Sequence, residues 1–307
     1  MASDARVPVR RSPDPDWEHR RLFERVREAI FAVPGNFRSN VVIRGVQATD
    51  LFNLNALLGA AIEEGVVDTL NSLRQLWDVR ERYAMYSFVR QPQTFPDVRL
   101  QNSADPSDII LGIELKGWYL LAKEKEPSFR FLATPAACAR PDLFVVYPWH
   151  LSEVISGVPQ LTVPYVELAR YVAEYRNRHW EFVMSHRKSA KVILSTSDQP
   201  YPTKTDEISD KAEHDAGRNF GRIARTGIMD DFADRSGNRP LSGIPARHWR
   251  SFLKIFTETA TEARIETALA RFADQVAKAA IQRDDLDNVR EVVDRLVETL
   301  WPRPSAP

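Results

Sequence analysis

Apolar and polar residues alternate most regularly between residues 109 and 119. At the centre of this stretch the odd-numbered residues are apolar, namely Leu111, Ile113 and Leu115. The even-numbered residues are glycine or charged, namely Gly112, Glu114 and Lys116. This alternation is typical of a strand with one face in a core. A shorter extended run, residues 98–100, precedes it, and the linking residues 101–108 are rich in turn formers. The pattern therefore predicts a β-hairpin.

Other strands are predicted where aromatic and β-branched residues concentrate. Residues 83–89 are expected to form the first core strand. Residues 143–147 are continuously apolar, as in a central strand that is buried on both faces. Residues 191–195 are expected at an edge of the sheet, and residues 128–131 are a further candidate.

Helices are predicted where apolar residues recur at intervals of three and four. The predicted helices cover residues 16–32, 51–62 (resuming at 66–77 after Gly65), 164–183, 249–280 and 286–300. The elements together predict an α/β fold, with a mixed central sheet flanked by helices and a helical C-terminal portion. Residues 1–15 are expected to be disordered, residues 16–205 to form the α/β core, and residues 206–307 to form the helical portion.

Candidate chemistry lies on the charged face of the hairpin. Asp97 follows Pro96 at the head of the shorter strand, and it can lie beside Glu114 and Lys116, because neighbouring strands are about 4.8 Å apart. Two close carboxylates repel each other unless a cation separates them, and their oxygens suit Mg²⁺, which also keeps water and phosphate ligands. A nearby ammonium can orient a water or stabilise developing charge. This combination suits phosphodiester hydrolysis.

The sequence Pro96-Asp97 followed by Glu114-Leu115-Lys116 resembles the motif of the PD-(D/E)XK nuclease superfamily, to which most type II restriction endonucleases belong. The resemblance covers the hairpin and, more loosely, the flanking helix and strand order. It implies a restriction-endonuclease-like core that cuts double-stranded DNA, with Mg²⁺ on Asp97 and Glu114 and water positioned by Lys116. It also implies a homodimer that acts at two-fold-symmetric sites.

Two other interpretations fit the same residues. One is a repair or recombination nuclease of this fold that has no sequence preference. The other is a non-catalytic DNA-binding module, in which Glu114 and Lys116 are only an exposed face of a strand. In the nuclease superfamily a helix before the hairpin often supplies another carboxylate, for which Glu63 is the first candidate, with Glu64 and Asp68 as alternatives.

Basic residues outside the hairpin are candidates for DNA contact. Ser128 and Arg130 follow the long strand and suit phosphate, as hydroxyl and guanidinium groups do. One face of a predicted helix carries three arginines, Arg218, Arg222 and Arg225. Arg239 extends this basic surface. The alternative role of these arginines is ion pairing with nearby aspartates. Arginines of the predicted helix 164–183, among them Arg170, face either a ligand or water.

Composition narrows the choice of compartment more than the choice of function. The chain has 42 basic and 42 acidic residues, so a nucleic-acid interface would need a local basic cleft and not an overall positive charge. Its single cysteine, Cys138, excludes an intramolecular disulfide and fits a reducing compartment. No apolar run is long enough to span a membrane, so a cytoplasmic protein is expected.

Overall fold

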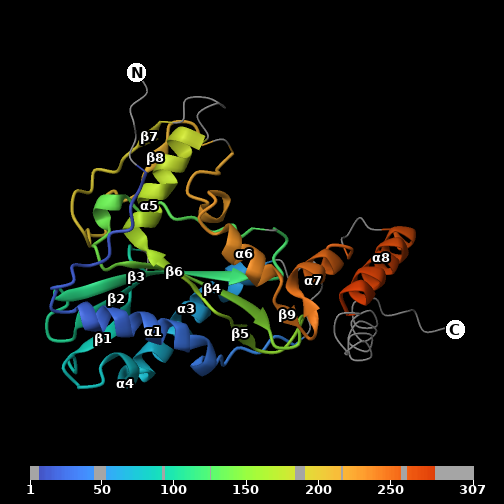
Figure 1. Ribbon diagram of the computed structural model, residues 1–307, viewed down its shortest axis with the longest axis horizontal. Coiled ribbons are helices and arrows are strands. Elements are labelled where there is room, and N and C mark those ends of the chain that lie inside the picture. Colours follow the sequence, from blue (N-terminus) through green and yellow to red (C-terminus); the bar gives the residue numbers. More distant parts are fainter. Residues whose placement is uncertain are drawn as a thin grey trace.

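The computed structural model describes residues 7–44, 53–91, 94–124, 126–183, 191–215, 217–256 and 261–280. Its centre is a mixed sheet of six strands, in the order β1-β2-β3-β4-β5 with β6 also paired to β4 (Figure 1). The strands are β1 (Tyr86–Arg90), β2 (Val98–Asn102), β3 (Ile109–Tyr119), β4 (Leu143–Leu151), β5 (Pro159–Leu161) and β6 (Tyr165–Leu168). Only the β3–β4 pair is parallel among these. The predicted α/β class is confirmed.

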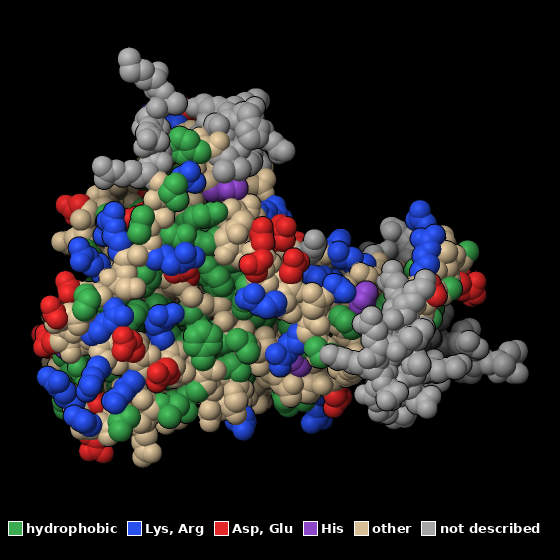
Figure 2. Space-filling model, in the orientation of Figure 1, with side chains coloured by type: hydrophobic (Ala, Val, Ile, Leu, Met, Phe, Trp, Pro, Cys, Tyr) green, Lys and Arg blue, Asp and Glu red, His purple; other side chains and the backbone are tan. Residues whose placement is uncertain are grey.

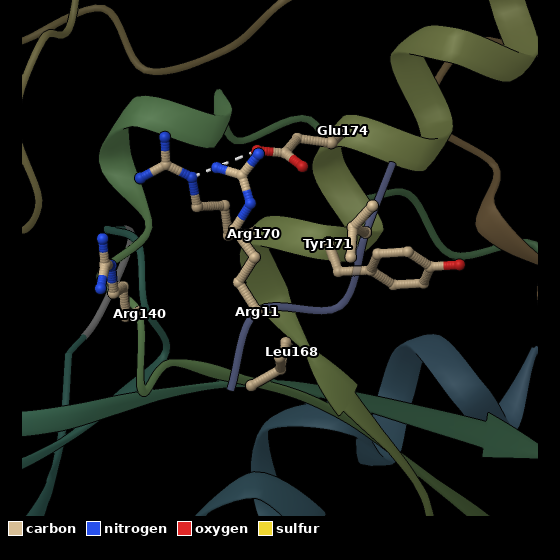
Figure 3. Close-up of a pocket in the computed structure, with 7 residues that line it drawn as sticks. Arg11, Arg140, Leu168, Arg170, Tyr171 and Glu174 are labelled. Carbon is tan, nitrogen blue, oxygen red and sulfur yellow. Dashed lines mark hydrogen bonds and ion pairs between the residues drawn. The ribbon is translucent and has the colours of Figure 1, made fainter. Parts of the chain in front are cut away.

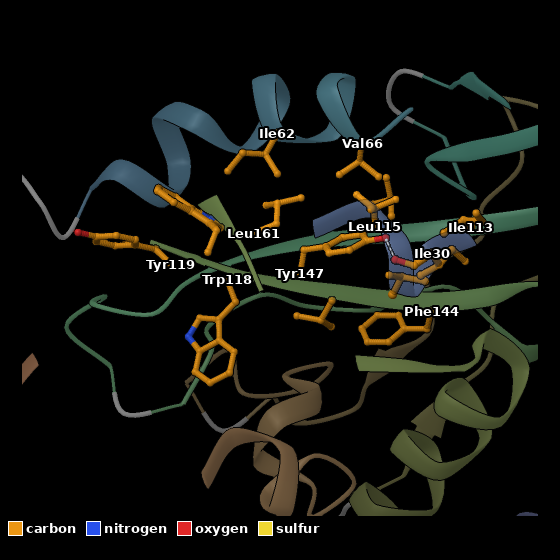
Figure 4. Packing of buried hydrophobic residues seen from close by; sticks show 14 of the residues in the cluster. Ile30, Ile62, Val66, Ile113, Leu115, Trp118, Tyr119, Phe144, Tyr147 and Leu161 are labelled. Carbon is orange, nitrogen blue, oxygen red and sulfur yellow. Dashed lines mark hydrogen bonds between the residues drawn. The ribbon is translucent and has the colours of Figure 1, made fainter. Parts of the chain in front are cut away.

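Helices cover both faces of the sheet. α1 (Arg20–Asn36), α3 (Leu54–Ser72) and α4 (Arg74–Trp77) lie on one side, and α5 (Ala169–Arg178) lies on the other (Figure 1). Ile62 and Val66 of α3 pack over Ile113 and Leu115 of β3 (Figure 4). Because successive side chains of a strand point to opposite faces, the even-numbered positions of β3 point away from α3.

The predicted hairpin is confirmed, with a difference in length. Val98 pairs with Ile113, and Leu100 pairs with Leu111, so the apolar positions of both strands share one face. A register shift follows Leu100, and β2 continues to Asn102 instead of ending at residue 100. The bulge lets the polar end of β2 remain paired, which the turn-rich composition of this stretch does not reveal.

Two other strands differ from their predicted limits. β1 begins at Tyr86, not at residue 83, because the backbone N–H of Tyr83 donates to a carboxylate oxygen of Asp78 in a turn. β4 continues through Pro148 to Leu151, since Trp149 and the two residues after it pair with β5. The proline is tolerated within β4, which runs four residues beyond the predicted end.

The predicted helix 164–183 is wrong over its first part. Its first residues form β6, which pairs antiparallel with β4, and the helix α5 begins only at Ala169. The partner strand decides this conformation, because β6 fills an edge of β4 that the sequence alone does not show to be open. After α5, residues His179–Val183 form a π-helical turn.

Two strand predictions near the sheet are also wrong. β7 (Val192–Ile193) does not join the main sheet but pairs with β8 (Lys211–Ala212) in a separate two-stranded sheet. Residues 128–131 form no strand; instead the N–H of Phe131 donates to the carbonyl of Gly221, a segment distant in sequence.

Several helix limits also differ. α1 begins at Arg20 and runs through Pro34 to Asn36. α3 continues through Gly65, where the ring of Phe37 packs so closely that an added Cβ would lie 2.7 Å from it. Residues 249–280 are not one helix but fall in α7 (Ala246–Leu253) and α8 (Glu262–Ala280). The predicted helix 286–300 lies outside the described residues.

The described residues between 206 and 272 include side chains that pack against the sheet domain. α6 (Asp230–Gly237) and the hairpin of β9 (Pro240–Leu241) and β10 (Ile244–Pro245) precede α7. Buried side chains of this region belong to the same hydrophobic cluster as the sheet, among them Ile223 of the 3₁₀ turn before α6, Phe232 of α6 and Trp249 of α7. Among the described residues, no helix has the length and apolar character needed to cross a membrane.

Candidate active site

The hairpin brings Asp97 next to Glu114. Val98 pairs with Ile113 in the antiparallel β2–β3 register, so the residue before β2 lies opposite the residue that follows Ile113. The N–H of Gln91 donates to the carbonyl oxygen of Asp97 at 2.7 Å, which ties this position to the end of β1. Three strands therefore fix the backbone at the first carboxylate.

Lys116 joins the two carboxylates. Its Nζ lies 2.7 Å from Oε1 of Glu114 and 3.2 Å from Oδ2 of Asp97. The same Oδ2 accepts a hydrogen bond of 2.9 Å from the backbone N–H of Leu115. The side chains of Glu114, Lys116 and Asp97 are 11%, 18% and 24% exposed, so the site is largely buried but still reaches the surface.

The electrostatics of the trio favour a proton or another cation on Glu114. Burial raises the pKa of Glu114 to about 7, helped by the charge of Asp97 and opposed by Lys116. Burial alone would lower the pKa of Lys116, but the charges of Glu114 and Asp97 outweigh it and hold that pKa above its usual value. Lys116 is therefore a persistent cation at neutral pH.

The donor set fits a magnesium ion that keeps several of its own ligands. Two carboxylates reach the same small region, and Mg²⁺ in proteins commonly takes one or two carboxylates together with water and phosphate. Within the described residues, no group of three or more His, Cys, Asp or Glu side chains is arranged to hold a metal ion. The remaining ligands would have to be water and substrate oxygens.

Glu63, the first candidate for a further metal ligand, is engaged elsewhere. Its Oε2 lies 2.9 Å from Nη2 of Arg90 at the end of β1. It belongs to α3, which covers the face of β3 that carries Ile113 and Leu115, and no hydrogen bond or ion pair joins Glu63 to the trio among the described residues. A ligand role for Glu63 would require it to leave Arg90.

The residues after β3 that were predicted to bind phosphate lie in irregular structure. Ser128 is exposed, and Arg130 lies 3.8 Å from a carboxylate oxygen of Asp215. The Nη2 atom of Arg130 is buried and has no hydrogen-bond partner in the described structure. Their predicted role in DNA contact remains a prediction.

The prediction that one face of a helix carries Arg218, Arg222 and Arg225 is wrong. Arg218 has a positive φ of 65°, and Arg225 lies in the single 3₁₀ turn Ile223–Arg225. Arg225 donates to Asn219 and pairs with Glu126, while Arg222 donates to the carbonyl of Arg218. The loop around Gly217 and Gly221, both with positive φ, replaces the helix.

A local concentration of positive charge is not evident on the face shown in Figure 2. Lys and Arg side chains are distributed over several elements and are interspersed with Asp and Glu. Arg239 lies between α6 and β9, where its carbonyl accepts from the N–H of Ala246. DNA contact by Arg239 and by the three preceding arginines is untested by this geometry.

Sequence reasoning missed a buried carboxylate behind the candidate site. Oδ1 of Asp142 accepts from the N–H of Gly112 at 2.6 Å and from the hydroxyl of Tyr201 at 2.7 Å, and Oδ2 accepts from the N–H of Ala139 at 2.8 Å. Burial raises its pKa to about 6, although Tyr201 and the two backbone donors oppose this shift. The signal in the sequence is that Asp142 follows a proline and stands immediately before the apolar run 143–149.

This network supports the strand that carries Glu114. Gly112 lies two positions before Glu114, so the bond from Asp142 fixes the backbone of β3 next to the site. Arg99, which pairs with Gly112 across the hairpin, stacks over the ring of Tyr201 at 5.5 Å. The carboxylate thus links β3 to the loop that contains Tyr201, and Arg99 extends this contact to β2.

Comparisons with known proteins identified no relative of this chain. No protein-family model, no curated protein and no solved structure matches the chain.

Proposed function

We propose that this chain is a Mg²⁺-dependent endonuclease that hydrolyses phosphodiester bonds of double-stranded DNA, most like a type II restriction endonuclease. One observation carries the proposal: Asp97, Glu114 and Lys116 meet on a buried strand face that still reaches the surface. The finer expectations, a restriction-endonuclease-like core and a cytoplasmic homodimer acting at specific sites, follow from the resemblance of the motif.

Asp97 and Glu114 would hold the metal ion in this proposal. When bound, a divalent ion makes water more acidic and neutralises charge that develops on a phosphate. The N–H of Leu115 already orients Oδ2 of Asp97, and Lys116 orients Oε1 of Glu114. The chain thus presents fixed oxygens, with little side-chain reorganisation left to the binding event.

Lys116 would act as a hydrogen-bond donor and a fixed positive charge. The carboxylates on both sides hold its pKa above the usual value. Lys116 therefore stays protonated at neutral pH and does not act as the base that takes a proton from water. An ammonium in this position can orient the attacking water and stabilise the negative charge of the transition state. The proton from that water would then pass to solvent or to a substrate oxygen.

A non-catalytic DNA-binding module is the second candidate, and one observation favours it. Lys116 already pairs with both carboxylates, so the trio can be a strand face that is held together by its own ion pairs and needs no metal. Discrete fragments from a long DNA incubated with the protein and Mg²⁺, but not with chelator, would support a site-specific nuclease. Random magnesium-dependent degradation would support a repair-type nuclease, and intact DNA that is nevertheless bound would support the module.

A further inference from the structure

A pocket beside the N-terminus of α5 is rich in arginine. It has a volume of about 80 Å³, room for more than one water molecule. Figure 3 shows Arg11, Arg140 and Arg170 among its lining residues, each from a different segment of the chain. Arg11 and Arg140 are exposed and the side chain of Arg170 is 43% exposed, so an anion from solvent can reach all three guanidinium groups.

The carboxylates nearby do not balance this charge. Glu174 is the acidic side chain that lines the pocket, and it pairs with Arg170 at 3.2 Å. Neither Arg11 nor Arg140 has a carboxylate partner among the described residues. The lining therefore keeps an excess of two positive charges.

The N-terminal segment is held in place by contacts next to the pocket. The guanidinium of Arg10 pairs with Glu167 at 2.7 Å and lies 4.5 Å from the centroid of the Tyr171 ring. These contacts use Glu167, the acidic residue of β6, so Glu167 does not neutralise the pocket. They also place Arg11 against α5; of residues 1–15, which are expected to be disordered, residues 1–6 lie outside the described structure.

The helix adds to the same field. α5 has ten residues and begins at Ala169, whose N–H donates to the carbonyl of Asp142. The next N–H groups of the first turn, with their partial positive charge, belong to the pocket residues Arg170 and Tyr171. Guanidinium groups bind phosphate oxygens through two parallel hydrogen bonds. The arginines carry the argument, and the helix end reinforces it.

We propose that this pocket binds a phosphate group, as a dianion or as one phosphodiester of a larger ligand. The excess of two charges matches a phosphate dianion, and the volume suits a small tetrahedral oxyanion better than a nucleobase. The proposal goes beyond the nuclease function and does not depend on it.

The register of the sheet relates the pocket to the trio. Glu167 pairs with Phe144, and Phe144 pairs with Glu114, so the strand next to the pocket lies two strands from the candidate metal site. Two spacings of about 4.8 Å give a separation of about 10 Å between the backbones of β3 and β6. A backbone phosphate of bound DNA and a free phosphate are thus the two sources to separate.

Calorimetric titration with inorganic phosphate, in chelator and without DNA, tests the pocket directly. The variant Arg11→Gln/Arg140→Gln is compared with Arg21→Gln/Arg80→Gln, which changes two exposed arginines of the α1 and α4 region. We expect saturable binding in the wild type and in the control, and at least a tenfold weaker affinity in the pocket variant, because that variant removes two charged hydrogen-bond donors. Absence of saturable binding, or equal affinity in both variants, would overturn the proposal.

Competition identifies the source of the phosphate. In chelator, inorganic phosphate that displaces a DNA duplex from the wild type, but not from the pocket variant, would assign the pocket to a backbone phosphate. Simultaneous binding of duplex and phosphate would assign it to a free phosphate or a small phosphorylated ligand. Because no cleavage is measured, the result is independent of the proposed nuclease activity.

Discussion

Nζ of Lys116 lies 2.7 Å from Oε1 of Glu114, the side chain two positions earlier on β3, and the same ammonium reaches Asp97 across the hairpin. Without metal, the ammonium neutralises part of the charge of both carboxylates. A divalent ion must therefore bind at this site beside the ammonium of Lys116, which is already present. The pKa of Glu114, raised to about 7, shows that one ammonium does not fully offset the cost of burying both charges.

Metal binding should depend steeply on pH. Because the pKa of Glu114 is about 7 and a ligand carboxylate must be ionised, Mg²⁺ affinity should fall about tenfold for each pH unit below 7 and level off above about pH 8. Calorimetric titrations between pH 5.5 and 8.5 would measure this. Glu63→Gln should keep the profile, since Glu63 pairs with Arg90. An affinity that is constant across this range would exclude Glu114 as a ligand.

The stability of the metal-free protein should also depend on the ionisation of Glu114. It should fall as pH rises, whereas Mg²⁺ affinity should rise. The folded pKa of Glu114 lies above its unfolded value, so the folded state binds more protons between about pH 4.5 and 7, and this contribution to stability is lost as pH rises through that range. Glu114→Gln should therefore be more stable than the wild type at pH 8 in chelator, by about 1–3 kcal/mol. Urea denaturation at pH 5 and pH 8 would measure the difference, and a less stable variant at pH 8 would contradict the electrostatic account.

The hairpin was predictable because its period of two is read directly from neighbouring residues. Asp97, Glu114 and Lys116 could be placed together for the same reason. β6 could not be predicted, because Tyr165–Leu168 becomes a strand only where β4 offers an unpaired edge. The arginine loop was mistaken for a helix, since a spacing of four and three is also compatible with the turns that Gly217 and Gly221 allow.

The pocket and the support behind the trio depend on tertiary structure alone. Arg11, Arg140 and Arg170 are far apart in the sequence, and no local period links them. Asp142 finds Gly112 and Tyr201 only after the sheet and the later loop have formed. Local patterns therefore identified the strand that carries Glu114 and Lys116, whereas its surroundings required coordinates.

A methyl group on Gly112 should disturb the site. Its Cβ would lie 2.4 Å from Cγ of Pro96 and 3.0 Å from Oδ1 of Asp142, so the turn that carries Asp97 would have to move. We expect Gly112→Ala to lose about 1–3 kcal/mol of stability, as overpacked cores do, and to weaken Mg²⁺ binding. Thermal unfolding and metal titration would measure both effects.

Gly59→Ala is the matched control for this change. Gly59 lies within α3, and an added Cβ would have no atom within 4 Å. Because alanine favours a helix over glycine, this variant should be more stable by about 0.5–1 kcal/mol. Equal effects of the two substitutions would contradict the close approach at Pro96.

The three hydrogen bonds of Asp142 should contribute to the stability of the fold. Asp142→Asn puts an amide N–H₂ where one carboxylate oxygen accepted a bond, so at least one buried donor loses its acceptor, at a cost of about 1–3 kcal/mol. Tyr201→Phe removes only one of these bonds and should cost about 1 kcal/mol. Chemical denaturation would rank the variants, and a Tyr201→Phe variant less stable than Asp142→Asn would contradict this assignment.

The central claim is that the trio hydrolyses DNA, and cleavage by matched variants tests it most directly. Asp97→Asn, Glu114→Gln and Lys116→Met nearly preserve side-chain size while removing the charge, and each should reduce magnesium-dependent cleavage of duplex DNA by at least a hundredfold, since electrostatic groups of this kind contribute about 10²–10³ in rate. Duplex binding in chelator and cleavage by Glu63→Gln should remain within a few-fold of the wild type. Undiminished cleavage by the three variants, or no cleavage by the wild type with Mg²⁺, would contradict the account.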